Sequence, residues 1–264
     1  MKIAFWSPEA GHSGTTGSML AIALLSCLKL KKSVFLLHNQ FMDRSMEKAV
    51  FGNETADMYE DIGLDSLARN IKVSPLTEDI INNSSMSLYK DMIHILPGTA
   101  KENKNLFEKD ISITIPSIIN AVNSFYDLTF VNLAAGADIN SSKIMEEADL
   151  IVVTFAQDKN MIDKYFSKYH LPEEKTLYLI GKYNCKSRYN LKNLERCYPK
   201  LKNKTEAIPY NVGFMDAMAD GKVMQFIVKN LVNCKGDNNK IFFKKINKAV
   251  DLLFGNEKGA GEIQ

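Results

Sequence analysis

Short runs of apolar, β-favouring residues alternate with longer segments of helical period along most of this chain. Strands that are connected through helices in this way form βαβ units, whose parallel sheet is covered on both faces. We expect strands at residues 3–6, 34–38, 92–96, 128–133, 150–155, 177–181 and 206–209, and helices at residues 18–31, 112–124, 160–168, 191–198 and 215–232. The predicted fold is α/β, with a single doubly wound, mainly parallel sheet. Ligands of such sheets bind beyond the carboxyl ends of the strands.

The chain is long enough for this fold to form one domain. Its 264 residues are 45 % hydrophobic, which is sufficient for a large core. No internal repeat or low-complexity linker interrupts the alternation, so we place one domain over residues 1–254 and expect a disordered tail over 255–264. No apolar run reaches the ~18 residues of a membrane span, and the N-terminus lacks a signal-peptide pattern. These features predict a cytoplasmic protein.

The charges and the cysteines argue against two classes of function. Lysine and arginine total 33 and aspartate and glutamate total 31, which gives a formal net charge of +2. A protein built to neutralise nucleic-acid phosphates is expected to be more basic, so we predict no specific nucleic-acid partner. The cysteines contain no C-x-x-C pair, so free thiols are favoured over a metal site or disulfides. They are Cys27, Cys185, Cys197 and Cys234.

Residues 9–18, EAGHSGTTGS, lie between the first expected strand and the first expected helix. Gly11 and Gly14 can adopt backbone angles that direct successive N–H groups into one concavity, and two threonines open the helix at its positive end. This arrangement is typical of phosphate-binding loops, although the loop contains no lysine. The same residues also fit an ordinary helix start that is capped by Ser13 or Thr15. On this stretch alone, both interpretations stay open.

Several segments resemble motifs of the MinD/ParA family of deviant Walker-type P-loop ATPases, in the order found in that family. Residues 10–17, AGHSGTTG, align with K-G-G-x-G-K-T-T, and residues 34–40, VFLLHNQ, align with V-L-L-I-D-x-D. Residues 94–98, HILPG, match the end of the third strand. Residues 126–136, YDLTFVNLAAG, resemble Y-D-x-x-x-x-D-x-P-P-G, and residues 208–223 resemble I-P-x-D…A…G-x-x-V. Within the family, the chain is most similar to the TadZ-like proteins of pilus and secretion loci.

The resemblance implies an ATP site at the start of the first helix. Its phosphate-binding residues would be Gly11, His12, Ser13, Gly14, Thr15, Thr16 and Gly17. Thr16 would be a Mg²⁺ ligand if nucleotide binds, because it holds the hydroxyl position of the motif. The base pocket would contain Asn184, Pro209, Tyr210 and Asn211, although proline and asparagine in this pattern are equally typical of a turn.

The residues that serve catalysis in this family are replaced here. The two loop lysines fall on Ala10 and Thr15, Glu9 replaces the first glycine, and the two carboxylates fall on His38 and Asn132. Losing one charge-assisted hydrogen bond to phosphate costs roughly 1.5–3 kcal/mol, or about ten- to a hundredfold in affinity. A cation aimed at the transition state is worth about 10³–10⁵ in rate. We therefore expect ATP and Mg²⁺ binding to be weak or absent, and hydrolysis to be weak or lost.

The alternative is an active ATPase with rearranged catalytic residues, in which His38 and Thr16 take the active roles. His12 and His38 would then face each other across the site, and a histidine can act as a base near neutral pH. We favour simple hydrogen bonding for both histidines, and a tethering role for Asn132. Basic residues after the sixth expected strand either reach a phosphate or base or are simply solvated. They are Lys182, Lys186 and Arg188.

Residues 241–254, IFFKKINKAVDLLF, have the pattern of an amphipathic helix with lysines beside its apolar face. Relatives of MinD use a C-terminal helix of this kind for peripheral membrane contact. We favour a helix that packs on the sheet instead, because the basic face is short.

A homodimer is expected from the resemblance, through the face that carries the glycine loop. Its contacts would include His12, Asn39 and the small residues 134–136. The predicted function is that of a nucleotide-binding protein or pseudo-ATPase that acts as a dimeric spatial organiser. It would recruit the protein partners of a pilus, secretion or partition-type assembly.

Overall fold

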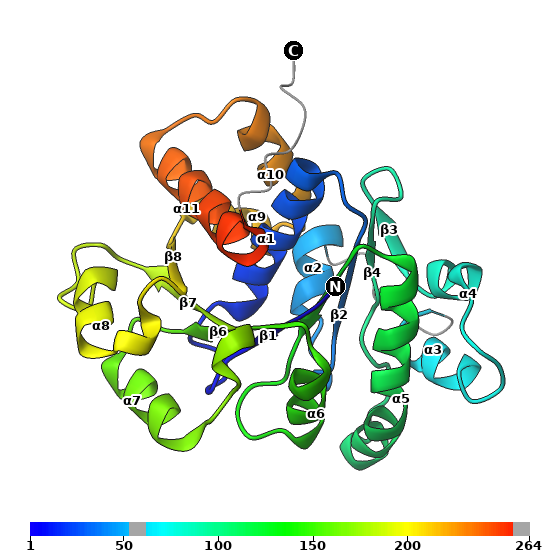
Figure 1. The fold of residues 1–264 in the computed structure, drawn as a ribbon. Helices are drawn as coiled ribbons and strands as arrows, with labels where there is room; N and C mark the ends of the chain where they lie inside the picture. The colour runs from blue at the N-terminus through cyan, green and yellow to red at the C-terminus, as the bar shows by residue number, and fades with distance from the viewer. Residues whose placement is uncertain (53–61, 256–264) are drawn as a thin grey trace.

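The computed structural model describes residues 1–52 and 62–255. These residues form an eight-stranded sheet in the order β3-β4-β2-β5-β1-β6-β7-β8, with helices on both faces (Figure 1). Neighbouring strands are parallel except for β3, which is antiparallel to β4. The strands are β1 (Lys2–Trp6), β2 (Val34–His38), β3 (Met86–Leu88), β4 (Ile93–Ile95), β5 (Leu128–Asn132), β6 (Leu150–Phe155), β7 (Thr176–Tyr183) and β8 (Thr205–Pro209). The predicted doubly wound, mainly parallel sheet is confirmed.

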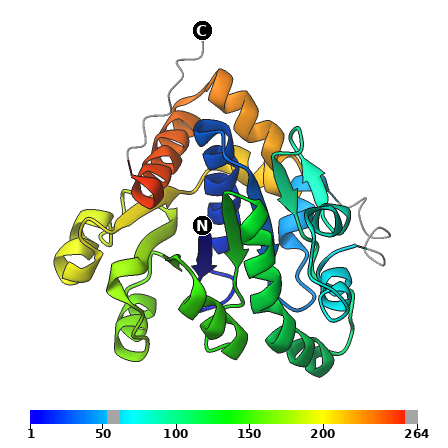
Figure 2. The same ribbon diagram turned by 45° about the vertical axis from the view of Figure 1, so that its right-hand side comes forward.

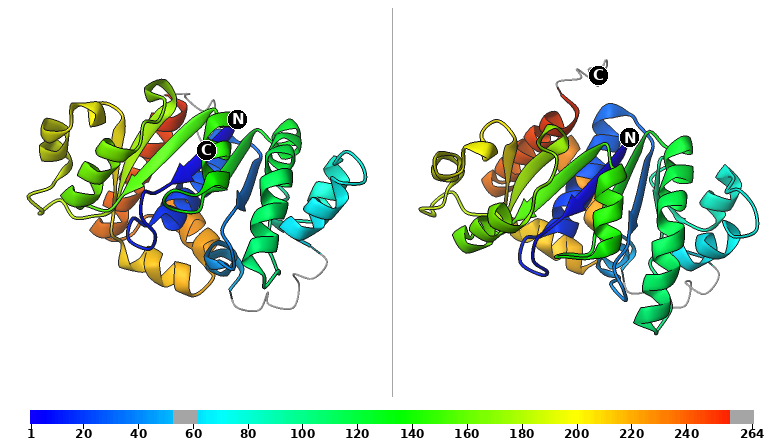
Figure 3. Two further views of the ribbon diagram at one scale, coloured as in Figure 1. Left: turned by 90° about the horizontal axis from the view of Figure 1, so that it is seen from below. Right: turned by 60° about the horizontal axis from the view of Figure 1, so that its bottom comes forward.

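Helices cover both faces of the sheet (Figures 2 and 3), and a hydrophobic core lies on each face. Alternate residues of a strand face opposite cores, so Phe5 packs in the first core and Trp6 in the second. The first core is covered by α1 (Thr15–Leu30), α2 (Ser45–Phe51), α9 (Val212–Ala219), α10 (Val223–Val232) and α11 (Asp237–Phe254). The second is covered by α3 (Leu64–Asn70), α4 (Glu78–Asn83), α5 (Lys104–Phe125), α6 (Ile139–Glu147), α7 (Lys159–Lys168) and α8 (Leu191–Cys197).

The expected single helix over residues 215–232 is wrong, because α9 and α10 are separate helices. Gly221 lies between them with φ of +71°. A Cβ atom at Gly221 would lie 2.2 Å from the backbone nitrogen of Gly52, at the end of α2. The chain therefore turns where only a glycine fits against α2.

The C-terminal helix α11 packs on the sheet, as we favoured. Its apolar residues Phe242, Ile246 and Val250 are buried in the first core. Lys245 also bonds to Glu206 of β8, with 2.6 Å between Nζ and Oε1. The apolar face of α11 is therefore used within the fold. No helix in the described part of the chain is long and apolar enough to cross a membrane, and the tail prediction, from residue 256 on, lies outside the described residues.

Candidate functional site

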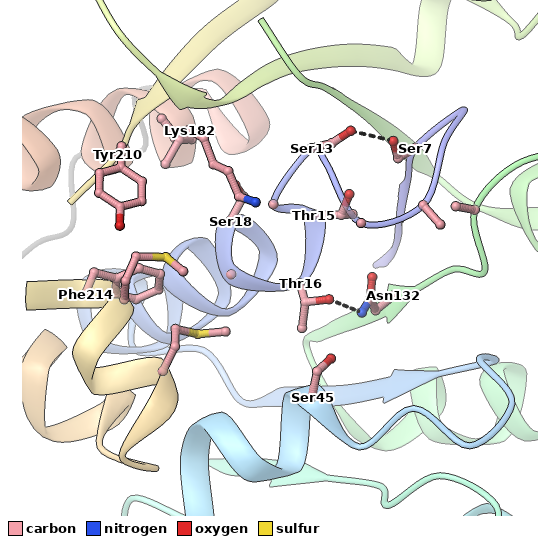
Figure 4. A pocket seen from close by; sticks show the side chains of 18 of the residues that line it. Ser7, Ser13, Thr15, Thr16, Ser18, Ser45, Asn132, Lys182, Tyr210 and Phe214 are labelled. Carbon is pink, nitrogen blue, oxygen red and sulfur yellow. Dashed lines mark hydrogen bonds between the residues drawn. The ribbon is translucent and has the colours of Figure 1, made fainter. Parts of the chain in front are cut away.

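A cavity of about 370 Å³ lies at the carboxyl ends of the strands (Figure 4). Its wall is formed by the loop after β1, the start of α1, the segment after β2, the ends of β5, β7 and β8, and parts of α9 and α11. We call it the glycine-loop cavity, after the loop of residues 7–14. This position agrees with the rule that ligands of doubly wound sheets bind beyond the carboxyl strand ends.

Two glycines of the glycine loop have backbone angles of a kind found in anion-binding loops. Gly11 and Gly14 have φ angles of +82° and +66°, in the left-handed region. Ser13 is buried, and its hydroxyl is 2.7 Å from the hydroxyl of Ser7. Within the described part of the chain, no side chain caps the start of α1, so the ordinary capping by Ser13 or Thr15 is not found there. The first-turn N–H groups and the positive end of a 16-residue helix are therefore available to an anion.

His38, which ends β2, is bonded to α2. Its Nε2 lies 3.0 Å from Oε1 of Glu47, and the same oxygen accepts the N–H of Gly98 at 2.8 Å. Burial lowers the pKa of His38, but the Glu47 carboxylate outweighs this effect and holds that pKa above its usual range. Burial raises the pKa of Glu47, but its bonds to His38 and to backbone N–H groups hold that pKa below its usual range. The pair is buried and does not line the cavity.

The expectation that His12 and His38 face each other across the site is wrong. His12 is exposed, whereas His38 is only 3 % exposed and bonded to Glu47. Neither imidazole lines the glycine-loop cavity. The structure therefore does not place His38 where it could activate a water molecule in that cavity.

Asn132 ends β5, and its Nδ2 donates to the hydroxyl of Thr16 at 2.9 Å. This bond ties the end of β5 to the first turn of α1, directly after the glycine loop. Asn132 is 1 % exposed, and its Oδ1 has no hydrogen-bond partner in the described chain. A buried acceptor without a partner is costly, so this oxygen can accept from a bound water or ligand. Both Thr16 and Asn132 line the cavity.

Only some residues of the expected base pocket line the glycine-loop cavity. Pro209, Tyr210 and Asn211 line the cavity, and a base-binding role for them stays a prediction. Asn211 also caps α9, since its Oδ1 accepts the N–H of Phe214 at 2.8 Å. Asn184 is not among the residues that line the cavity, and its role in binding a base stays a prediction. Its backbone N–H and carbonyl are both bonded to the side chain of Gln157.

The three basic residues at and after the end of β7 behave differently from one another. Lys182 lines the cavity, whereas Lys186 and Arg188 do not. The guanidinium of Arg188 lies 4.8 Å from the ring centre of Tyr189 and donates to its hydroxyl. Only one of the three is therefore placed to reach a ligand of the glycine-loop cavity.

The sequence motifs do not identify several other residues that line the glycine-loop cavity. Phe214, Met215 and Met218 come from α9 and Phe242 from α11, and they form an apolar side of the cavity. These residues are far from the glycine loop in the sequence, so no sequence motif could place them beside it. Asp43 also lines the cavity, and its Oδ1 accepts the N–H of Ser45 at 2.8 Å. The position of Asp43 after a strand's carboxyl end is a signal that could have identified it.

No family model matches this chain, and no curated protein does either. Solved structures are similar to it across their lengths. A ParA family ATPase from Chlorobium tepidum TLS is 14 % identical, with a TM-score of 0.72 over 94 % of this chain and 98 % of that one. The septum site-determining protein MinD from Pyrococcus horikoshii OT3, complexed with Mg-ADP, is 16 % identical, with a TM-score of 0.64 over 97 % and 98 %. A chain of the Aquifex aeolicus MinC:MinD cell division complex is 16 % identical, with a TM-score of 0.62 over 94 % and 95 %.

These similarities establish the fold of the chain. It has the architecture of ParA and MinD ATPases, with the glycine loop between its first strand and first helix. The order of the sequence motifs and the fold therefore agree.

Proposed function

We propose that this protein binds ATP in the glycine-loop cavity, hydrolyses it slowly or not at all, and acts as a dimeric spatial organiser. One observation carries this proposal. The glycine loop carries left-handed glycines and leads into a helix start without a side-chain cap, whereas the side chains at the two expected carboxylate positions are bonded to protein groups. His38 is bonded to Glu47, and Asn132 is bonded to Thr16. Binding and hydrolysis are thus separated, because they depend on different residues.

The cavity wall fits a nucleotide with Mg²⁺. The uncapped start of α1 and the left-handed glycines suit the phosphates. Tyr210 and Phe214 offer aromatic faces to a base. Mg²⁺ prefers oxygen ligands and keeps several waters. The hydroxyl of Thr16 would ligate it directly and the free Oδ1 of Asn132 would accept from one of its waters, while ATP supplies phosphate oxygens.

Binding and turnover should be measured separately. Calorimetry with ATP and Mg²⁺ is expected to give saturable binding, and phosphate release is expected to stay at background. The matched variant Asn132→Asp restores the family's carboxylate and serves as the comparison. Absence of ATP binding by the wild type would contradict the proposal. Phosphate release at ordinary P-loop rates, abolished by Thr16→Ala, would support the rearranged ATPase instead.

The second candidate, an active ATPase, is favoured by Asp43. This carboxylate lies on the cavity wall, unlike His38. A carboxylate there could orient an attacking water. Asp43→Asn would then abolish phosphate release while ATP binding persists, and release that is unchanged by this substitution would exclude the role.

The cellular role follows from the sequence resemblance. The TadZ-like motifs favour a pilus or secretion-type assembly, and the Aquifex aeolicus relative is part of a complex with a second protein. We infer that this protein is a homodimer that recruits protein partners at one cellular site. A fluorescent fusion produced from its native locus should gather at discrete positions. A uniform distribution that persists with all neighbouring genes present would contradict the inference.

A further inference from the structure

The end of β7 carries an irregularity beside the glycine loop. Ile180 pairs with Ala207 of β8, and the pairing resumes only at Tyr183 with Pro209, so β7 has one more residue than β8 in this interval. Such a bulge redirects a side chain, and bulges are frequent next to functional sites. The residues in the bulge are Gly181 and Lys182.

Gly181 allows the bulge to press against the glycine loop. A Cβ atom at this position would lie 1.9 Å from the carbonyl oxygen of Ser13, closer than any side chain permits. Lys182 has φ of +49°, a left-handed conformation that residues with a Cβ rarely adopt. A strained backbone at a cavity wall is an observation that calls for a functional explanation.

The side chain of Lys182 lies over Gly14 at the start of α1. Its Cγ and Cε would be 3.5 and 3.6 Å from a Cβ atom built on Gly14. Figure 4 shows the side chain extending from β7 toward the start of α1, between Tyr210 and the glycine loop. The methylene groups thus rest on the loop, and the ammonium ends at the cavity.

The ammonium of Lys182 has no hydrogen bond or ion pair within residues 1–52 and 62–255. The carboxylates of Glu9 and Asp43 on the cavity wall are bonded to groups other than Lys182. Glu9 pairs with Lys164 at 2.5 Å, and Asp43 accepts the N–H of Ser45. A cation beside the positive end of a helix is unfavourable unless an anion lies between them. The unpartnered, buried Oδ1 of Asn132 is a second, independent group on the same wall that lacks a partner.

We propose that Lys182 supplies the phosphate-binding ammonium that the glycine loop itself lacks. The cation comes from the end of β7, and it contacts the terminal phosphates of a nucleoside triphosphate from above Gly14. This assignment rests on the proposed nucleotide binding. It explains together the bulge, the strained backbone of Lys182, the close approach at Gly181 and the absence of a lysine at Thr15.

The test compares ATP, ADP and adenosine binding by calorimetry in wild type and in Lys182→Met. We expect the substitution to weaken ATP binding ten- to a hundredfold, and adenosine binding to change little, because only phosphate contacts are lost. Lys186→Met is the matched control, since Lys186 follows the same strand but does not line the cavity. Lys182→Gly suits the left-handed backbone, so it keeps the test valid if the methionine variant does not fold.

A rescue distinguishes a phosphate contact from a structural effect. In the double variant Thr15→Lys with Lys182→Met, the cation returns to the loop, and ATP affinity should recover. Equal ATP affinity of the wild type and both Lys182 variants would refute the role of Lys182 and leave the proposed function standing. A wild type that binds no ATP would refute the proposed function and, with it, the role of Lys182.

Discussion

Replacing Gly181 with alanine should displace the glycine loop without removing any group that contacts a ligand. The added Cβ would lie 1.9 Å from the carbonyl oxygen of Ser13, and real Cβ atoms stay at least 3.0 Å from such an atom. The strand and the loop must therefore separate by about 1.1 Å. The loop resists this movement because Ser13 is buried and its hydroxyl is bonded to Ser7.

The expected cost is that of overpacking a close-packed region, about 1–3 kcal/mol. In a domain of this size 1 kcal/mol corresponds to about 2–4 °C, so Tm should fall by roughly 2–12 °C. A loop moved by this distance also loses at least one N–H bond to phosphate, which weakens ATP binding about tenfold or more. Thermal unfolding followed by circular dichroism, and calorimetry well below Tm, measure the two effects.

Gly17→Ala is the matched control, because it adds the same methyl group in the same region. Its Cβ would lie 3.4 Å from the ring of Phe214, which is ordinary contact, and α1 favours alanine over glycine by about 1 kcal/mol. Its Tm should stay level or rise. If Gly181→Ala were as stable as wild type and bound ATP equally well, the close approach of β7 to the loop would be refuted.

Three further substitutions test other parts of the molecule. Glu47→Gln should lower the free energy of unfolding by about 1.5–3 kcal/mol, most between pH values of about 4.3 and 6.5, where Glu47 is ionised and His38 is protonated. Because the pKa of His38 is raised and that of Glu47 lowered in the folded protein, urea unfolding should show this loss shrinking as pH rises from about 6.5 through the pKa of folded His38, and as pH falls from about 4.3 through that of folded Glu47. Gly221→Ala should lower Tm, because its Cβ would meet Gly52 at 2.2 Å; an unchanged Tm would contradict the packing of α9 on α2. Gly136→Arg should convert the proposed dimer to a monomer in analytical ultracentrifugation. A dimer that persists in this variant would exclude the glycine-loop face as the dimer interface.

The strands could be predicted because each is a run of apolar residues that is buried on both faces. The seven strands expected from the sequence match observed strands within a few residues, because their side chains pack into the two cores. The antiparallel β3 was missed because it has only three residues, of which Ser87 is exposed and the other two are only partly buried. The break between α9 and α10 was missed because it depends on Gly52, which is remote in sequence from Gly221.

The sequence predicted those parts of the site that are formed by consecutive residues. The glycine loop and the carboxyl ends of the strands are local features, and they do line the cavity. The partner of His38 was not predictable, because Glu47 reaches it from a helix that the sequence pattern did not reveal. The place of Lys182 depends on a bulge, and a bulge is decided by pairing between strands rather than by local sequence.

Whether nucleotide controls dimerisation depends on which chain supplies the groups that contact the nucleotide. A ligand shifts an equilibrium only by its difference in affinity for the two states. Here the loop amides, Thr16 and Lys182 all come from one chain, and Ala10, which aligns with a loop lysine in the sequence resemblance, has no ammonium to offer a partner's phosphate. ATP would thus make the same contacts in monomer and dimer. We therefore expect the same dimer dissociation constant in sedimentation with and without ATP and Mg²⁺, and a tenfold tightening by ATP would show that residues of a second chain contact the nucleotide.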